Sequence, residues 1–256
     1  MEHTKTPTKA HQPINYKVVA LIFAASITYH ILNSLYGNND SYSIFDLMLD
    51  IAVPLVAVFS FIVVKRCWDS EVFRNTYLSL GLAYVMSTVG NVIWNIQESI
   101  LHTDPYPSIS DVFYFAYYPF AVYHLLKNGM YFKRKLEQRT KIWLCALPVI
   151  ILIIYVYFSD QEGVDNFDFW YGMIFVSADG VVLAFIILGF QVFRKSILGP
   201  VWGLLLVGIM TYVVADVWYY HLAIFDLYDS THFINMLYML SPMIIIYALY
   251  KHLKTI

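Results

Sequence analysis

The chain has 256 residues, of which 59% are hydrophobic and only 13% are charged, and its formal net charge is −2. A soluble domain usually carries nearly twice that charged fraction, so the composition excludes an ordinary soluble protein. We expect the lipid bilayer as a partner of this chain and expect no nucleic acid.

The first sixteen residues, 1–16, are polar and are predicted to be a cytoplasmic tail. Apolar segments follow, each long enough to cross a hydrocarbon core about 30 Å thick. We therefore predict an all-α integral membrane protein with eight transmembrane helices in a single domain at 17–254. The predicted helices lie at 17–36, 45–64, 75–100, 110–127, 142–159, 168–193, 199–223 and 232–251.

The sixteen lysines and arginines lie in or next to alternate connecting segments. The remaining four connections contain none of them, and these are 37–43, 102–108, 159–168 and 225–231. Because cytoplasmic loops carry the excess of Lys and Arg, both termini are predicted to be cytoplasmic and these four loops to face outward. The predicted location is the cell membrane, crossed several times.

The third and fourth predicted helices share a pattern with the seventh and eighth. The matching positions are Trp94 with Trp218, Asp111 with Asn235, and Pro119 with Pro242. A duplication would give two parallel halves, 17–127 and 142–254, as in some transporters. The alternative is chance similarity among aromatic-rich helices, and the pattern leaves both open.

Three predicted helices begin with the same chemistry on the outer side. The segments Ser43–Asp46, Ser108–Asp111 and Asp165–Asp168 are each typical of a capping box, in which side chains satisfy free amide groups at a helix start. An acidic residue in the first turn also complements the helix dipole. The first-turn carboxylates therefore have a structural explanation, which we favour for each of them.

Four acidic residues lie deeper than a cap requires: Asp50, Glu98, Asp179 and Asp216. An Asp at the centre of a membrane helix costs about 2.5–3.5 kcal/mol on insertion scales, so it should face the bundle interior and have a partner or be protonated. The sequence places no lysine or arginine at that depth. The partners must then be His, Tyr, Asn, Ser, a metal ion or a shared proton.

Polar residues also recur at helical spacing, and on the third predicted helix Asn91, Asn95, Glu98 and His102 are expected to share one face. Each such stripe lies in the outer half of the predicted bundle or reaches it. Together they predict an outward-facing polar cavity. The residues predicted to bind a ligand there are Asn91, Asn95, Glu98, Asp111, Tyr114, Tyr118, Asp179, Asp216 and Tyr220. The alternative is that these groups only join the helices by hydrogen bonds worth about 0.6 kcal/mol each.

Histidines in the outer half suggest a second chemistry. His30, His102 and His221, with Asp216, could hold zinc and an activated water, the arrangement of a hydrolase that cleaves a lipid amide or ester. They occur singly, without a pair at ligand spacing on one helix. We predict no cofactor and keep zinc as an alternative.

The segment DPYPSISDVFYFAYYPF at 104–120 follows a helix with Trp94 and Glu98 and precedes one with Asp216. In this respect the chain resembles an uncharacterised group of multi-helix membrane proteins of archaea and bacteria. The residues that match their P-x-P-S-x-x-D-x-x-Y-x-x-x-Y-P-like signature are Pro105, Pro107, Ser108, Asp111, Tyr114, Tyr118 and Pro119. In that group this module is often the membrane part of sensor histidine kinases or cyclic-di-GMP enzymes, so the resemblance implies a sensory module.

The chain departs from that group because it ends at KHLKTI, without a kinase or cyclase domain. A sensory role would then require a cytoplasmic or membrane signalling partner. Our leading hypothesis is a membrane sensory, ligand-binding module with an outward polar cavity. The alternatives are a metal-dependent lipid hydrolase, an ion-coupled transporter of small solutes, and a structural subunit of a membrane complex. The oligomeric state is left open.

Overall fold

The computed structural model describes residues 13–37, 42–103, 105–132, 137–159, 166–225 and 227–255. Within these ranges the chain is helical, without a β-strand, so the all-α prediction is confirmed there. The helices are α1 (Tyr16–Tyr36), α2 (Ile44–Arg66), α3 (Glu71–Asn95), the π-helical turn η1 (Ile96–Leu101), α4 (Ile109–Phe132), α5 (Gln138–Ser159), α6 (Asn166–Phe193), α7 (Gly199–Ile224) and α8 (Ile234–Thr255). The predicted tail at 1–16 lies mostly outside the described residues.

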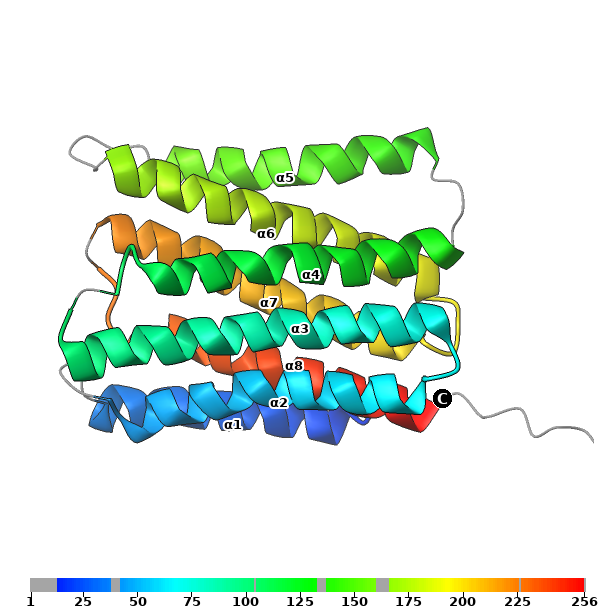
Figure 1. Cartoon of the computed structure of the whole chain (residues 1–256), viewed down its shortest axis with the longest axis horizontal. Coiled ribbons are helices and arrows are strands. Elements are labelled where there is room, and N and C mark those ends of the chain that lie inside the picture. Colours follow the sequence, from blue (N-terminus) through cyan, green and yellow to red (C-terminus); the bar gives the residue numbers. More distant parts are fainter. Residues whose placement is uncertain are drawn as a thin grey trace, which may run out of the picture.

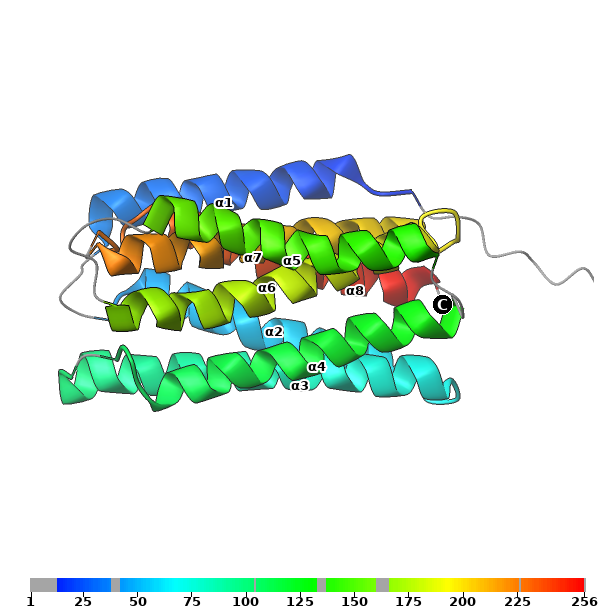
Figure 2. The ribbon, with the colours of Figure 1, turned by 90° about the horizontal axis from the view of Figure 1, so that it is seen from above.

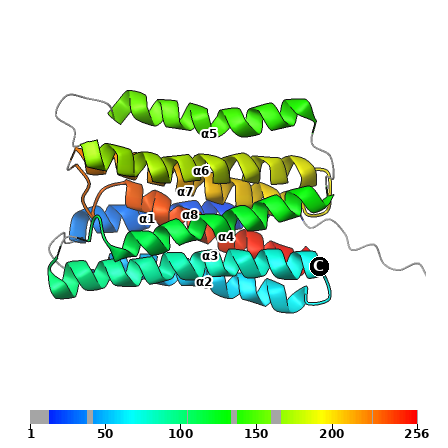
Figure 3. The ribbon, with the colours of Figure 1, turned by 45° about the horizontal axis from the view of Figure 1, so that its top comes forward.

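The helices run side by side along one axis, and each is antiparallel to the next in the chain (Figure 1). Helix α1 lies along one edge of the bundle in Figure 2, and α5 lies along one edge in Figure 3. Only 22% of the apolar stretch of α1 and 11% of that of α5 is buried, against 61% for α8. The bundle is therefore built around α8, α7, α6 and α3, with α1 and α5 added at its edges.

Seven of the described helices are long and apolar enough to cross a membrane. The helix outside this group is α4, which carries several tyrosines together with His124, Lys127 and Asn128. Helices suit a membrane because every backbone hydrogen bond is made within the segment. The structure thus supports a multi-pass helical membrane protein.

The two ends of the described chain meet at one end of the bundle. The backbone N–H of Asn15 donates to the Tyr247 hydroxyl at 2.9 Å, and the Lys251 ammonium donates to the Pro13 carbonyl at 2.8 Å. Basic residues also lie at this end of the bundle, for example Lys65 and Arg66 at the end of α2. The described basic residues and both ends of the described chain therefore share one end of the bundle.

Helix starts at the opposite end show the predicted capping chemistry. At α2, Ser43 and Asp46 form a complete capping box. At α4, the carboxylate of Asp111 accepts the backbone N–H of Ser108 at 2.7 Å. The predicted box at α6 begins at Asp165, which lies outside the described residues.

Several helices extend beyond the apolar runs from which they were predicted. The helix predicted at 110–127 is observed as α4, Ile109–Phe132, and the one predicted at 232–251 as α8, Ile234–Thr255. Backbone hydrogen bonding continues through polar residues, whereas a run of apolar residues stops at the first of them. The predicted boundaries therefore mark where apolar side chains give way to polar ones, which is not where the helices end.

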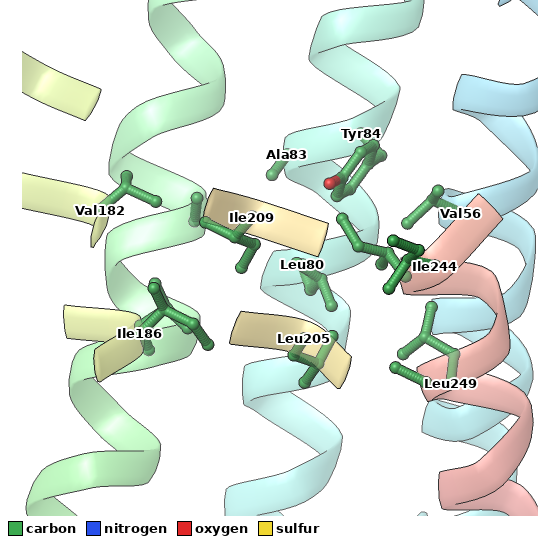
Figure 4. Close-up of a cluster of buried hydrophobic side chains, with 14 of the residues drawn as sticks. Val56, Leu80, Ala83, Tyr84, Val182, Ile186, Leu205, Ile209, Ile244 and Leu249 are labelled. Carbon is green, nitrogen blue, oxygen red and sulfur yellow. The ribbon is translucent and has the colours of Figure 1, made fainter. Parts of the chain in front are cut away.

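An apolar layer crosses the middle of the bundle (Figure 4). It includes Leu80 of α3, Leu205 of α7 and Ile244 of α8, all almost fully buried. On α3 and α8, polar residues lie on both sides of the layer. Two polar regions are thereby separated by close-packed side chains.

Candidate functional site

A cavity of about 390 Å³ lies between α2, α3, α4, α7 and α8, toward the end of the bundle opposite the basic residues. This volume falls within the range of about 300–1,000 Å³ that is usual for small-molecule sites. Its polar lining residues are Asp46, Asp50, Tyr84, Ser87, Asn91, Asn95, Glu98, Asp111, Tyr114, Tyr118, Tyr212, Asp216, Tyr219, Tyr220, Tyr228, Asp229, Ser230, Asn235, Tyr238 and Ser241. Phe175 of α6, together with Trp94, Leu49, Val53 and Pro242, completes the wall.

The structure brings together eight of the nine residues that the sequence predicts to bind a ligand. Those that line the cavity are Asn91, Asn95, Glu98, Asp111, Tyr114, Tyr118, Asp216 and Tyr220. The ninth, Asp179, is 1% exposed and lies behind the wall, where it interacts electrostatically with Asp216 and Tyr118. Their role in binding remains a prediction.

The helices α3 and α4 meet closely at this wall. The Tyr114 hydroxyl donates to the side-chain oxygen of Asn91 at 3.0 Å. Gly90 makes this contact possible, because a Cβ there would lie 2.6 Å from the Tyr114 ring. The glycine therefore fixes where a tyrosine of α4 crosses α3.

The wall formed by α2 was not included in the predicted site. Asp46 and Asp50 lie one turn apart on the same face of α2, and both line the cavity. One oxygen of Asp50 accepts hydrogen bonds from the Tyr42 hydroxyl at 2.7 Å and from the Asn95 amide at 2.5 Å. The depth of Asp50 in its predicted helix could have indicated that it lines the cavity. Asp46 was explained as a capping residue, so its place on the cavity wall was missed.

Asp216 joins α7 to two other helices. Its carboxylate accepts hydrogen bonds from the Tyr238 hydroxyl at 2.7 Å and the Tyr118 hydroxyl at 3.3 Å. Asp179 lies next to Asp216 and near Tyr118, yet neither of its oxygens makes a hydrogen bond of normal geometry within the described residues. A proton held between the two carboxyl groups would satisfy both of them.

The electrostatic character of the cavity is one-sided. Six of its described lining residues are Asp or Glu, and none is Lys, Arg or His. The effect reaches the loop between α7 and α8: burial raises the pKa of Tyr228, and the negative charges of Glu98, Asp46 and Asp229 raise it further. The cavity thus disfavours an additional negative charge.

The predicted stripe on α3 does not continue to His102. The helix widens into η1, and His102 follows it with a left-handed backbone (φ 50°) and an exposed side chain. A π-helical turn contains an extra residue, so spacing of three or four no longer keeps side chains on one face. Glu98 stays on the cavity wall and bonds the Trp94 indole N–H at 3.1 Å, but His102 leaves it.

The residues proposed for zinc do not gather. Among the described residues, no three His, Cys, Asp or Glu side chains form a group able to hold a metal ion. The Nδ1 of His221 lies 3.4 Å from the Ser159 hydroxyl, and the Nδ1 of His30 is buried without a hydrogen-bond partner in the described part of the chain. Asp216 lies with Tyr118 and Tyr238 instead, and zinc binding remains only a prediction.

A second buried polar cluster, on the far side of the apolar layer, was not foreseen. His124 of α4 and His252 of α8 both contact the ring of Tyr77 of α3, and the His124 ring stacks on Trp202 of α7 with centroids 6.0 Å apart. The Tyr77 hydroxyl bonds Nδ1 of His252, and Nδ1 of His124 bonds the Thr76 carbonyl at 2.9 Å. The prediction from the sequence involved only the outer histidines, so this inner cluster was missed.

We expect Tyr77→Phe to destabilise the protein by about 1–3 kcal/mol, because it leaves the buried His252 Nδ1 without its partner. Tyr84→Phe is the matched control on α3, since the buried Tyr84 hydroxyl lies near Tyr117 but makes no hydrogen bond of normal geometry with a described residue. Thermal unfolding of the purified protein in detergent would compare the two variants. Equal stability losses would contradict this account of the inner cluster.

No protein-family model matches the chain, and searches of curated proteins and of solved structures likewise give no match. The site must therefore be interpreted from its own geometry.

Proposed function

We propose that this chain is a multi-pass membrane protein that binds a small ligand in the cavity, and that it acts as a sensory or ligand-binding module. One observation carries the proposal: acids and tyrosines from five helices line a single cavity of about 390 Å³. Buried polar groups in membrane segments are costly, and they usually mark functional sites. Structural hydrogen bonding alone would not require a cavity.

The proposed topology has eight crossings with both termini in the cytoplasm of the cell. Although α4 is less apolar than the rest, it has 24 residues and packs between α3 and α6, which are both long and apolar enough to span. A helix in that position would cross with its neighbours. The basic end of the bundle then lies inside, and the cavity opens outward.

An internal duplication is part of this proposal. Two helix pairs in the first half have counterparts in the second, α2–α3 with α6–α7 and α3–α4 with α7–α8. The contact between the halves is also matched, because α2 packs on α8 and α6 packs on α4. The peripheral helices break the pattern, because α1 packs on α8 whereas α5 packs on α6. The matching pairs support a common origin of α2–α4 and α6–α8.

Signal transfer would use α4 and α8, each of which contains a proline beside or in the cavity wall. Pro119 interrupts α4 and Pro242 interrupts α8, and each removes one backbone hydrogen bond at which a helix can bend. Ligand binding between these helices would shift their inner ends. A cytoplasmic or membrane partner in contact with these inner ends would respond to the shift.

The test is a variant that fills the cavity. Ser87 is a buried lining residue of α3, and we expect Ser87→Phe to abolish the thermal stabilisation that any cavity ligand gives. Val92→Phe on the same helix is the control, because Val92 is 49% exposed on the outer surface. A small-molecule screen by thermal unfolding would use both variants beside the unmodified chain.

The proposal fails if no compound stabilises the unmodified chain, or if every stabilising compound acts equally on Ser87→Phe. Folding of both variants would be checked by size-exclusion chromatography. Since Val92→Phe adds the same bulk on the outside of α3, it reports on effects of the larger side chain alone.

A second candidate function is ion-coupled transport, favoured by the adjacent carboxyl groups of Asp179 and Asp216. Buried carboxyl pairs of this kind occur in proton relays of membrane transporters. The two candidates differ in one property: only a transporter would move solute into liposomes in response to a proton or sodium gradient.

A further inference from the structure

The charge of the cavity is not balanced by its described lining. Six acidic side chains line it, and no described lining residue is basic. The hydrogen bonds to the carboxylates of Asp50 and Asp216 come from hydroxyl and amide groups, which are neutral. An occupant that carries a positive charge would supply the missing charge.

The same cavity is rich in aromatic rings. Eight tyrosines line it, together with Trp94 and Phe175. The ring of Phe175 stacks on Tyr220 with centroids 5.0 Å apart, and Tyr212 meets Tyr238 edge-on at 5.9 Å. Aromatic faces attract cations, and cages of such rings are a recurrent way to bind quaternary ammonium groups.

Two hydroxyl groups on the wall have no hydrogen-bond partner of normal geometry among the described residues. They belong to Ser241 and Tyr84, which both line the cavity and are both at least nine-tenths buried. Buried hydroxyls normally find a partner, so these two are available to a polar group of a ligand. Pro242 adds an acceptor, since it leaves the carbonyl of Tyr238 without its intrahelical N–H.

From these three features we propose that the cavity binds a small organic cation, an amine or a quaternary ammonium compound. The proposal rests on the ligand-binding function proposed above and adds the chemical class of the ligand. The carboxylates provide attraction over several ångströms, the tyrosine rings provide close contact, and the two hydroxyls bond a short polar tail. Anionic ligands such as phosphates are disfavoured, because no basic group of the described lining faces them.

A neutral polyol is the main competitor, because acids and aromatic rings also bind sugars. The lining tyrosines Tyr114, Tyr118 and Tyr238 already direct their hydroxyl protons to Asn91 or Asp216. Fewer donors thus remain for a ligand made of hydroxyl groups. The charge, by contrast, remains available to a cation.

The test compares choline with 3,3-dimethylbutan-1-ol, which has the same shape with carbon in place of the charged nitrogen. The purified full chain would be studied in detergent at low ionic strength, where electrostatic attraction is least screened. Trp94 lines the cavity, so tryptophan fluorescence would report binding alongside thermal unfolding. We expect choline and tetramethylammonium to bind saturably and the neutral alcohol to bind at least about tenfold more weakly.

Variants provide the second arm. We expect Glu98→Gln and Asp216→Asn each to weaken choline binding at least about tenfold. Asp69→Asn is the matched control, because Asp69 is exposed between α2 and α3 and does not line the cavity. If Asp216→Asn does not fold, Glu98→Gln and the comparison of the two probes still decide the result.

The outcomes separate the two proposals. Equal binding of choline and the neutral alcohol would overturn the cationic class while leaving ligand binding intact. The same conclusion would follow if choline did not bind at all but compounds of other chemistry did, and if Ser87→Phe excluded those compounds. Failure of every compound to bind would overturn both the cationic class and the ligand-binding function.

Discussion

Replacing Trp202 by alanine is expected to lower the free energy of unfolding by about 3–5 kcal/mol, which is among the largest losses that a single core substitution produces. Trp202 is fully buried in α7, beside the apolar layer and in contact with the inner cluster. Its ring stacks on Phe193 with centroids 4.5 Å apart and planes 9° apart. It also lies against Gly189, where a Cβ would collide with the ring.

The expected loss comes from packing. The space left by the indole would be bounded by α4, α6 and α7. Since α6 packs against both α4 and α7 through many other residues, these helices cannot collapse fully into it. The indole N–H has no hydrogen-bond partner among the described residues, so removing it costs nothing in hydrogen bonding there. Trp202→Phe, which keeps a ring in place, should therefore lose much less stability than the alanine variant.

Trp218→Ala is the control, on the same helix. Trp218 is 45% exposed on the outer face, where lipid can replace it, so we expect a change of less than about 1 kcal/mol. Chemical or thermal unfolding in detergent would measure both. Similar losses at the two positions would mean that the packing around Trp202 does not stabilise the fold.

The second large effect is expected in the opposite direction, because Asp179→Asn should stabilise the protein by about 1–3 kcal/mol. The Asp179 carboxyl is buried next to Asp216, and no described group donates a hydrogen bond of normal geometry to it. An amide has nearly the same shape, needs no shared proton to lie beside Asp216, and can donate a hydrogen bond to that carboxylate. Evolution often retains such costly groups where function needs them.

Unfolding of the Asp179→Asn variant would be compared with that of Asp69→Asn, in which an exposed acid is changed in the same way. The control should show no change, since it alters a solvated group. A loss of stability on changing Asp179 would contradict this arrangement of the two carboxyl groups and would indicate a partner that depends on the carboxylate. The same variant in liposomes would bear on transport, because coupling through this pair requires both acids.

Much of the fold could be predicted from the sequence. Apolar length and backbone chemistry together dictate helices in a membrane, since no other open structure satisfies every peptide group there. The cap at Ser43 and Asp46 was also readable, because a capping box is a local pattern of side chains and nearby amides. Helix ends were less accurate, because polar residues at the ends of α4 and α8 continue the helix beyond the apolar run.

The candidate site was partly predictable for a related reason. Residues such as Asn91 and Asn95 recur at helical spacing, so they share one face of α3, and the cost of exposing polar groups to lipid turns that face inward. Both line the cavity. The same reasoning failed at His102, because the π-helical turn before it shifts the register, and no pattern in the residues announced that turn.

Three features could be read from the residues alone: the helical character of the chain, the sides of its helices that face the interior, and the separation of basic from acidic ends. These are properties of one helix at a time, and they follow from spacing and solvation. The packing of the helices was needed to show that α2 and α8 complete the cavity and that Asp179 lies behind its wall. It was also needed to show that Tyr77, His124 and His252 meet in the inner half. Which helices become neighbours depends on the fit between their surfaces, and lipid is too similar to apolar side chains for hydrophobicity to reveal that fit in the sequence.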